Sequence, residues 1–516
     1  MKESIRFTPQ ATPSSPSKRL RAMGARASAV VWLLTALVLL PLLGTRSQKA
    51  STRPHGVVRE QAQNIDQALQ CGKVGETEGV SPGTDLFRVD LDMRDFPNAV
   101  CNDGTPATMF VRRFARKKDK NKWVIFLLGG GNCENVLDCA QRWCSIDTGY
   151  GANKMSTAYL NQQGAGQSIE GDGIFTRDAS INNFAGWNLV YVYYCSSDNW
   201  SGTASGVRLS GTDESGNQLD YLINFRGADI LDAVIAALQR EPRGREVTYR
   251  DSTNGEEILP DIDKAELVLF TGSSAGAEGV KINVDRVGEL LRKTNKNCKN
   301  KTDCGLDYRG VIDANYPPSF HSLDLTQAAF CTAFPYRCTY DDVYTNRWNQ
   351  VQVATYHALN DDSCVKWHQQ MIPGTEWMCS DGQHIVNNHL TTPLFIRVDL
   401  QDPNLGGKFQ DQHLTTPAQF GQLTHDQLLA VENLDSFAEE GSARSGGARL
   451  KSPAVFGPQC EQHYGLSVSR PFFTVTITDS GKRYNFHDVL WNWVQGTPPQ
   501  QIVRTFAGPG PAPDCP

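Results

Sequence analysis

The chain has 516 residues, of which 40% are hydrophobic and 21% are charged, an ordinary globular composition that can build a large core. The formal net charge is −6, although residues 1–28 hold six Lys or Arg side chains against a single Glu. The acidic remainder argues against nucleic acid or another polyanion as the main partner.

The first 70 residues are expected to lie outside the folded domain. Residues 1–28 are basic and rich in Ser and Pro, which is typical of disordered chain. The uncharged apolar segment 29–44 is either a signal anchor or a cleaved signal peptide. The long basic segment before it and the poor cleavage site after it favour an anchor, with the following chain across the membrane in the type II orientation; cleavage would give a secreted protein. Residues 45–70 are the predicted stalk, and residues 71–516 the predicted folded domain.

Fourteen cysteines are spread from Cys71 to Cys515. None stands in a C-x-x-C pair, and no paired Cys/His spacing typical of zinc occurs, so we expect no metal. An even number of cysteines beyond an export signal predicts disulfides formed in an oxidising compartment, with buried free thiols as the alternative.

Strand patterns and helix patterns alternate along the predicted domain. Four short apolar segments read as strands and two segments show helical periodicity: strands at 123–128, 188–194, 267–270 and 393–399, helices at 226–239 and after 274. This alternation predicts an α/β fold, a mostly parallel central sheet with helices on both faces.

The segment around residue 274 organises the chain. A strand runs into Gly272-Ser273-Ser274-Ala275-Gly276, a G-x-S-x-G pattern, and a helix follows. In this context the pattern predicts a nucleophile elbow, with Ser274 exposed above the sheet and the backbone N–H of Ala275 facing a developing oxyanion. A glycine-rich turn without chemistry is the alternative.

A nucleophilic serine needs a base and an acid that orients the base. Asp402 follows the strand at 393–399, where such an acid is expected, and Asp399 is its nearest competitor. Among the histidines after Ser274, His463 follows a cysteine that could anchor its loop, and His487 is the runner-up. The glycine run at 129–131, directly after a strand, could supply the second oxyanion donor.

Several motifs together resemble the Notum/pectin acetylesterase family of α/β-hydrolases. They occur in the family order between about residues 85 and 500: FLLGGGNC (126–133), YCSSDNWSG (194–202), FRGADILDAVIAAL (225–238), GSSAGAEGVKINVDR (272–286), PLFIRVDLQDPNL (393–405) and FGPQCEQH (456–463). The resemblance implies an α/β-hydrolase fold and a serine carboxylesterase activity.

The resemblance also implies residue roles. Ser274 matches the family's nucleophile, His463 its base and Asp402 its acid, seven positions after the strand Phe; the oxyanion donors are matched by Gly130, Gly131 and Ala275. Where the family usually has Gly-Gly-Trp, this chain has Asn132 after the two glycines, so one aromatic pocket wall is expected to be missing. Trp200 is expected to line the acyl pocket beside Asn132.

The expected function is hydrolysis of an ester on an acylated glycan or glycoprotein, with acetyl as the expected acyl group, through an acyl-enzyme on Ser274 and without cofactor or metal. Alternatives are a Notum-like deacylase for long acyl chains on proteins, a peptidase or amidase with the same triad, and a non-catalytic binding domain. Two N-glycosylation sequons begin at Asn199 and Asn300, and Asn300 is the better candidate because Asn199 falls in the expected site wall.

Overall fold

A computed structural model of the chain describes residues 62–75, 80–146, 149–162, 164–241, 245–300, 303–325, 328–332, 339–431, 453–513 and 515. The predicted basic N-terminus (1–28), the predicted signal segment (29–44) and most of the predicted stalk (45–70) lie outside these residues. Within the described ranges, no helix is both long enough and apolar enough to cross a bilayer.

The folded unit begins earlier than the predicted boundary at residue 71. A short helix, α1 (Ile65–Leu69), is capped by Asn64, whose side chain accepts a hydrogen bond from the N–H of Asp66. Ile65 is completely buried, and the N–H of Leu222 donates to the carbonyl of Gln63 at 2.8 Å. The end of the predicted stalk therefore packs on the domain.

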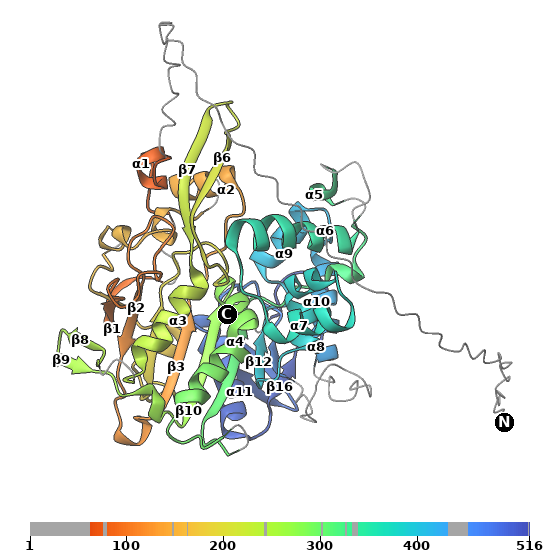
Figure 1. Cartoon of the computed structure of the whole chain (residues 1–516). Helices are drawn as coiled ribbons and strands as arrows, with labels where there is room; N and C mark the ends of the chain where they lie inside the picture. Colours follow the sequence, from red (N-terminus) through yellow and green to blue (C-terminus); the bar gives the residue numbers. More distant parts are fainter. Residues whose placement is uncertain are drawn as a thin grey trace, which may run out of the picture. The chain divides into compact units, whose positions relative to one another are not determined.

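The centre of the fold is a mixed sheet whose order is β16-β13-β12-β11-β10-β3-β5-β2-β1-β4 (Figure 1). Neighbours from β16 to β5 pair in parallel, whereas β5–β2, β2–β1 and β1–β4 are antiparallel. The strands are β1 Pro82–Asp90, β2 Thr108–Arg112, β3 Lys122–Leu127, β4 Ser168–Ile169, β5 Asn188–Val192, β10 Leu267–Ser273, β11 Asp307–Asp313, β12 Leu394–Arg397, β13 Ala454–Gly457 and β16 Gln501–Val503. The four predicted strands are β3, β5, β10 and β12.

Helices cover both faces of this sheet. On β12, Leu394 lies on the same side of the sheet as Val284 of α4 (Ala275–Thr294), because a Cβ built on Gly310 would meet both side chains, at 2.7 and 2.9 Å. The next residue, Phe395, packs on Phe486 and Trp493 of α11 (Phe486–Gln495). Since consecutive strand residues point to opposite faces, α4 and α11 lie on opposite sides. The predicted α/β-hydrolase-like architecture is confirmed.

The other helices of the described chain lie around this sheet (Figure 1). They are α2 Val136–Cys144, α3 Gly227–Leu238, α5 Ala329–Thr332, α6 Tyr340–Asn346, α7 Asp362–Met371, α8 Gly382–Asn388, α9 Pro403–Asp411 and α10 Pro417–Val431. In the part of the chain that the structure describes, three two-stranded hairpins stand apart from the main sheet: β6 Ala204–Thr212 with β7 Gln218–Phe225, β8 Thr248–Asp251 with β9 Gly255–Ile258, and β14 Thr476–Asp479 with β15 Lys482–Asn485. α5 to α8 are inserted between β11 and β12 in the chain. A doubly wound sheet binds its ligands at the carboxyl ends of its strands where the strand order reverses, here between β3 and β10.

The cysteines form disulfides, as predicted. Six join described cysteines: Cys71–Cys144, Cys101–Cys195, Cys133–Cys139, Cys298–Cys304, Cys364–Cys379 and Cys460–Cys515. They tie loops and the C-terminal tail to the sheet, which fits folding in an oxidising compartment.

Candidate active site

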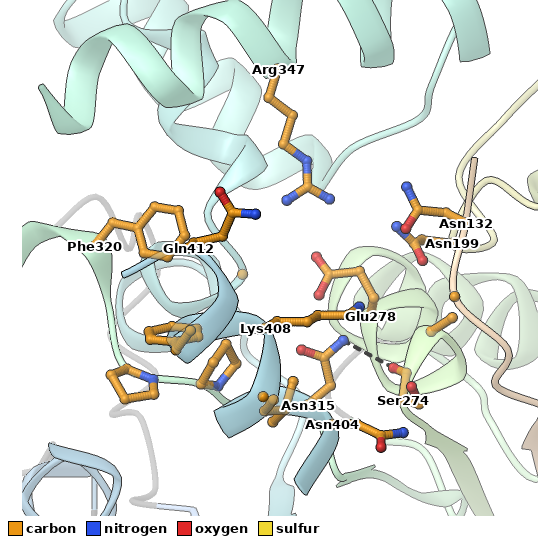
Figure 2. Close-up of a pocket in the computed structure, with 18 of the residues that line it drawn as sticks. Asn132, Asn199, Ser274, Glu278, Asn315, Phe320, Arg347, Asn404, Lys408 and Gln412 are labelled. Atoms are coloured by element: carbon orange, nitrogen blue, oxygen red, sulfur yellow. Dashed lines mark hydrogen bonds between the residues drawn. The ribbon is translucent and has the colours of Figure 1, made fainter. Parts of the chain in front are cut away.

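Ser274 stands at a strained turn between β10 and α4. Its backbone has φ 55° and ψ −119°, a conformation that non-glycine residues rarely adopt. Two groups at the end of β11 hold the turn: Ser274 N–H donates to the carbonyl of Asp313 at 2.9 Å, and Asn315 Nδ2 donates to the Ser274 carbonyl at 3.0 Å (Figure 2). The turn has the conformation and the strand-to-helix setting of the predicted elbow.

The glycine two positions after Ser274 is required by close packing. A Cβ at Gly276 would lie 1.9 Å from the carbonyl oxygen of Leu127, so the first turn of α4 touches the end of β3 directly. Only the absence of a side chain lets the helix and the strand approach this closely. The elbow therefore depends on Gly276 as well as on Ser274.

His463 and Asp402 form a buried pair. His463 Nδ1 lies 2.9 and 2.8 Å from the two carboxylate oxygens of Asp402, and the residues are 8% and 1% exposed. Asp402 also caps α9, because its Oδ1 accepts from the N–H groups of Asn404 and Leu405. Both His463 and Ser274 line one cavity. The pairing leaves His463 Nε2 as the nitrogen that could act as a base.

The competing candidates have other partners. Asp399 is completely buried beside Arg397 and accepts a hydrogen bond from the N–H of Cys460 at 2.7 Å, so it holds the loop that carries His463. Burial raises the pKa of the Asp399 carboxyl well above its usual range, and the nearby Arg397 only partly offsets this. His487 accepts from the N–H of Asn183 and packs among Phe rings, which is a structural role.

A buried ion pair supports the histidine loop. Arg397, at the end of β12, donates from Nη1 to the carbonyl of His463 at 2.8 Å and lies 3.4 Å from Asp313. Asp313 in turn accepts from Ser273 Oγ at 2.6 Å and from the N–H groups of Gly465 and Leu466. The elbow and the histidine loop are therefore fixed to the same carboxylate.

The glycine run after β3 borders Ser274. A Cβ at Gly129 would lie 2.9 Å from Ser274 Cβ, and Gly130 and Gly131 have φ angles of 140° and 63°. Gly131 lines the cavity together with Ser274 and Ala275, the first residue of α4. The predicted oxyanion residues thus gather at one place, with the N-terminal end of a 20-residue helix behind them.

The cavity has a volume of about 760 Å³ and a strongly charged wall. Glu278 pairs with Lys281 at 2.6 Å, and Figure 2 shows Arg347 and Lys408 reaching toward Glu278. Burial opposes ionisation of Glu278, yet Lys281 and Arg347 outweigh burial and lower its pKa. Likewise Glu134 and Glu278 raise the pKa of Arg347 against the effect of burial. Burial lowers the pKa of Lys408, with Arg347 adding to the effect.

Of the two residues predicted to line the pocket, Asn132 lines the cavity and Trp200 does not. Asn132 lines the cavity and its amide donates to Glu134 and to the hydroxyl of Tyr356. The expectation for Trp200 is corrected: its ring is completely buried, tilted against Tyr194, and its Nε1 donates to the carbonyl of Leu128. Trp200 belongs to the core, and its neighbour Asn199 lines the cavity instead.

Sequence reasoning missed the charged wall. Glu278 and Lys281 follow Ser274 by four and seven positions, so they lie on the helix face that Ser274 begins, and this spacing could have revealed them. Arg347 and Lys408 come from the inserted helices and from α9, where no local signal marks them. None of the charged groups at the cavity belongs to a close metal-ligand set among the described residues; such a set occurs elsewhere, on α7 and α8.

A mostly parallel sheet with helices on both faces defines the class, an α/β-hydrolase-like fold. Its strand-to-helix turn at Ser274 has the form of a nucleophile elbow, and His463 of the buried His–Asp pair lines the same cavity as Ser274. The sequence model of the Pectinacetylesterase family matches residues 89–244. The solved structure of the Wnt deacylase Notum from Drosophila has the same fold, with a TM-score of 0.52 over 84% of this chain and 99% of that chain at 22% identity.

Sequence relatives point the same way. Palmitoleoyl-protein carboxylesterase notum2 of Xenopus laevis is 27% identical over 72% of this chain and 60% of its own length. Palmitoleoyl-protein carboxylesterase NOTUM of Homo sapiens is 29% identical over 71% of this chain and 59% of its own length. The chain thus spans about 60% of these relatives. In sequence it is similar to members of the Notum/pectin acetylesterase family.

Proposed function

We propose that this protein hydrolyses carboxylic esters through an acyl-enzyme on Ser274. The single observation that supports this most strongly is the His463–Asp402 pair, which is bound through Nδ1 while His463 and Ser274 line the same cavity. His463 Nε2 would take the Ser274 proton, and Asp402 would hold the ring and stabilise the imidazolium. The names of the relatives, all carboxylesterases, support the same reaction class.

The oxyanion of the tetrahedral intermediate would form beside Gly131 and Ala275. Backbone N–H groups are the expected donors, because the glycine run and the helix N-terminus both border Ser274. One such donor contributes about 3 kcal/mol to lowering the barrier. Collapse of the intermediate would release the alcohol, which takes the proton from His463. Water, deprotonated by His463, would then attack the acyl-enzyme, and His463 would pass that proton to Ser274 Oγ as the acid leaves.

The test uses p-nitrophenyl acetate with the full chain and with Ser274→Ala. The wild type is expected to release nitrophenolate, and the variant is expected to lose about 10⁴-fold or more in kcat. Ser215→Ala is the matched control, since Ser215 is exposed in the turn of the β6–β7 hairpin and does not line the cavity. Equal rates for the wild type and Ser274→Ala would refute the proposal.

The charged wall favours a short acyl group on a polar carrier such as a glycan. A long acyl chain gains free energy only where its methylenes enter apolar surroundings, about 0.8 kcal/mol for each buried CH₂. Glu278, Lys281, Arg347 and Lys408 offer ionised groups instead, and they can bond sugar hydroxyls. Acetyl esters are therefore the proposed substrates.

The second candidate is hydrolysis of long-chain acyl esters on proteins, which the relatives' names favour. An ester panel from acetyl to palmitoyl separates the two, because kcat/KM should fall with chain length for the first and rise for the second. The disulfides support action outside the reducing cytosol, either secreted or membrane-anchored. Glycosylation is proposed only at Asn300, because Asn199 is 8% exposed.

A further inference from the structure

Three histidines come together on the inserted helices, away from the cavity. His368 lies on α7, His384 on α8, and His389 directly follows α8. The Nε2 atoms of His368 and His384 are 2.9 Å apart, and those of His384 and His389 are 3.3 Å apart. Two of the rings are buried and that of His384 is partly exposed. All three imidazoles direct the same nitrogen toward one point.

These distances fit a metal ion bound by all three rings. Three Nε2 atoms bound tetrahedrally at 2.0–2.1 Å from zinc are separated by about 3.3 Å. Without a metal, the Asn388 amide, 3.2 Å from His384 Nδ1, places the His384 proton on Nε2, where it can point squarely at only one of its two Nε2 neighbours. Metal binding would move that proton to Nδ1, with the Asn388 side chain turning its carbonyl oxygen to accept it. A divalent cation would bind the three Nε2 atoms at once.

The surroundings of His368 set its tautomer for metal binding. Thr375 Oγ1 gives its single hydrogen to the carbonyl of Ile372 at 2.6 Å, so it must accept from His368 Nδ1 at 2.7 Å. The proton of the neutral ring is therefore on Nδ1, and Nε2 offers its lone pair to the centre. Ligating histidines in metal sites are held by such a bond from the other ring nitrogen.

A disulfide keeps the ligand helices together. Cys364 on α7 is bonded to Cys379, which precedes α8. Cys364 Sγ lies within 4.8 Å of the ligand nitrogens, but as part of a disulfide it offers no thiolate, so the histidines are the ligands. Three protein ligands leave a fourth position, and the partly exposed His384 gives it access to water.

We propose that His368, His384 and His389 bind a divalent transition metal, with Zn²⁺ as the preferred ion and water as the fourth ligand. The spacing of these histidines matches no familiar zinc motif, which is why the sequence predicts no metal. Bound metal would fix α8, whose preceding residue and first turn (Asp381, Gly382 and Gln383) line the cavity that contains Ser274. The proposed role is to stabilise this cavity wall.

The test measures zinc on the full chain produced without a polyhistidine tag. After equilibration with ZnCl₂ and gel filtration, elemental analysis is expected to find one zinc per wild-type chain. His384→Gln, at the partly exposed ligand, is expected to weaken zinc binding by at least about tenfold. His321→Gln is the matched control, because His321 is exposed and lies outside the cluster.

Two further measurements do not depend on esterase activity, and the first of them needs no variant. Cobalt added to the wild type should give the visible absorption of tetrahedral Co²⁺, and zinc should raise the Tm of the wild type and of His321→Gln but not of His384→Gln. A wild type that retains no zinc would overturn the proposal, as would equal zinc affinity in the wild type and His384→Gln. Loss of zinc in His321→Gln would overturn it as well.

Discussion

At the scale of single residues, Asp402 has two roles on one carboxylate. It holds Nδ1 of His463 and it caps α9 through the N–H groups of Asn404 and Leu405. The loop that carries the proposed acid is thus shaped by the acid itself. Asp399, three positions earlier, has neither partner, although both aspartates follow the same strand.

Asp402→Asn should therefore damage the proposed chemistry more than the fold. An asparagine amide can turn its N–H₂ toward Nδ1 and hold the wrong tautomer of His463, so kcat for p-nitrophenyl acetate should fall by about 10⁴-fold. Asp488→Asn is the control, because Asp488 lies 3.3 Å from Nδ1 of the structural His487. Matching losses in the two variants would argue against a specific role for Asp402.

At the scale of elements, the junction of β10 with α4 is the tightest contact that the site depends on. Gly276 brings the helix against Leu127 of β3, and Ser274 is held by groups at the end of β11. Three parallel strands therefore fix one side chain. Because the contact is between backbones, it leaves no room for adjustment.

Gly276→Ala should destabilise the domain by about 2 kcal/mol or more, because its Cβ would meet the Leu127 carbonyl. Gly407→Ala, within α9, meets nothing within 4 Å and should stabilise slightly, by about 0.5–1 kcal/mol. Urea unfolding monitored by tryptophan fluorescence compares the two. An unchanged free energy of unfolding in Gly276→Ala would show that the elbow is packed more loosely than these contacts indicate.

The ion pair at the ends of β11 and β12 is a second point of fixation. Arg397→Met would leave Asp313 and Asp399 buried without their cation and release the His463 carbonyl, so the free energy of unfolding should drop by about 3–5 kcal/mol. Arg208→Met removes an ion pair with Asp220 on an exposed hairpin and should change the unfolding midpoint little. A similar loss of unfolding free energy in Arg397→Met and Arg208→Met would contradict a special role for the buried ion pair.

At the scale of the whole molecule, one disulfide links the C-terminal tail to the loop that carries His463. Cys460–Cys515 closes a loop of 55 residues and begins three positions before His463, whereas Cys298–Cys304 spans six residues far from the cavity. Loop closure alone predicts contributions of about 4 and about 2 kcal/mol, as upper values. The first bridge also anchors the histidine loop.

Replacing both cysteines of each bridge by alanine tests whether the Cys460–Cys515 bridge positions His463 in addition to stabilising the fold. Both double variants should lose stability in thermal unfolding, the Cys460/Cys515 variant more strongly. Only that variant should also lose kcat at a temperature where it remains folded, because its loop carries His463. Unchanged kcat in the folded Cys460/Cys515 variant would show that the ion pair of Arg397 positions His463 without the disulfide.

The sequence by itself predicts the elements that follow from local pattern. Short continuous apolar segments locate β3, β5, β10 and β12, and helical spacing locates α3 and α4. The G-x-S-x-G turn locates Ser274 because its conformation is a local requirement. Asp402 and His463 were open choices on position alone. Resemblance to a family chose them, since chain position says little about which distant side chains meet.

The tertiary structure decides the rest, because it depends on contacts between residues far apart in the chain. It moves Trp200 from the expected pocket into the core, places Arg347 and Lys408 against Glu278, and brings three histidines with unremarkable spacing to one point. The local sequence pattern predicts which face of a helix or strand is apolar. Only the packing of the inserted helices on the sheet determines which polar groups then face one another.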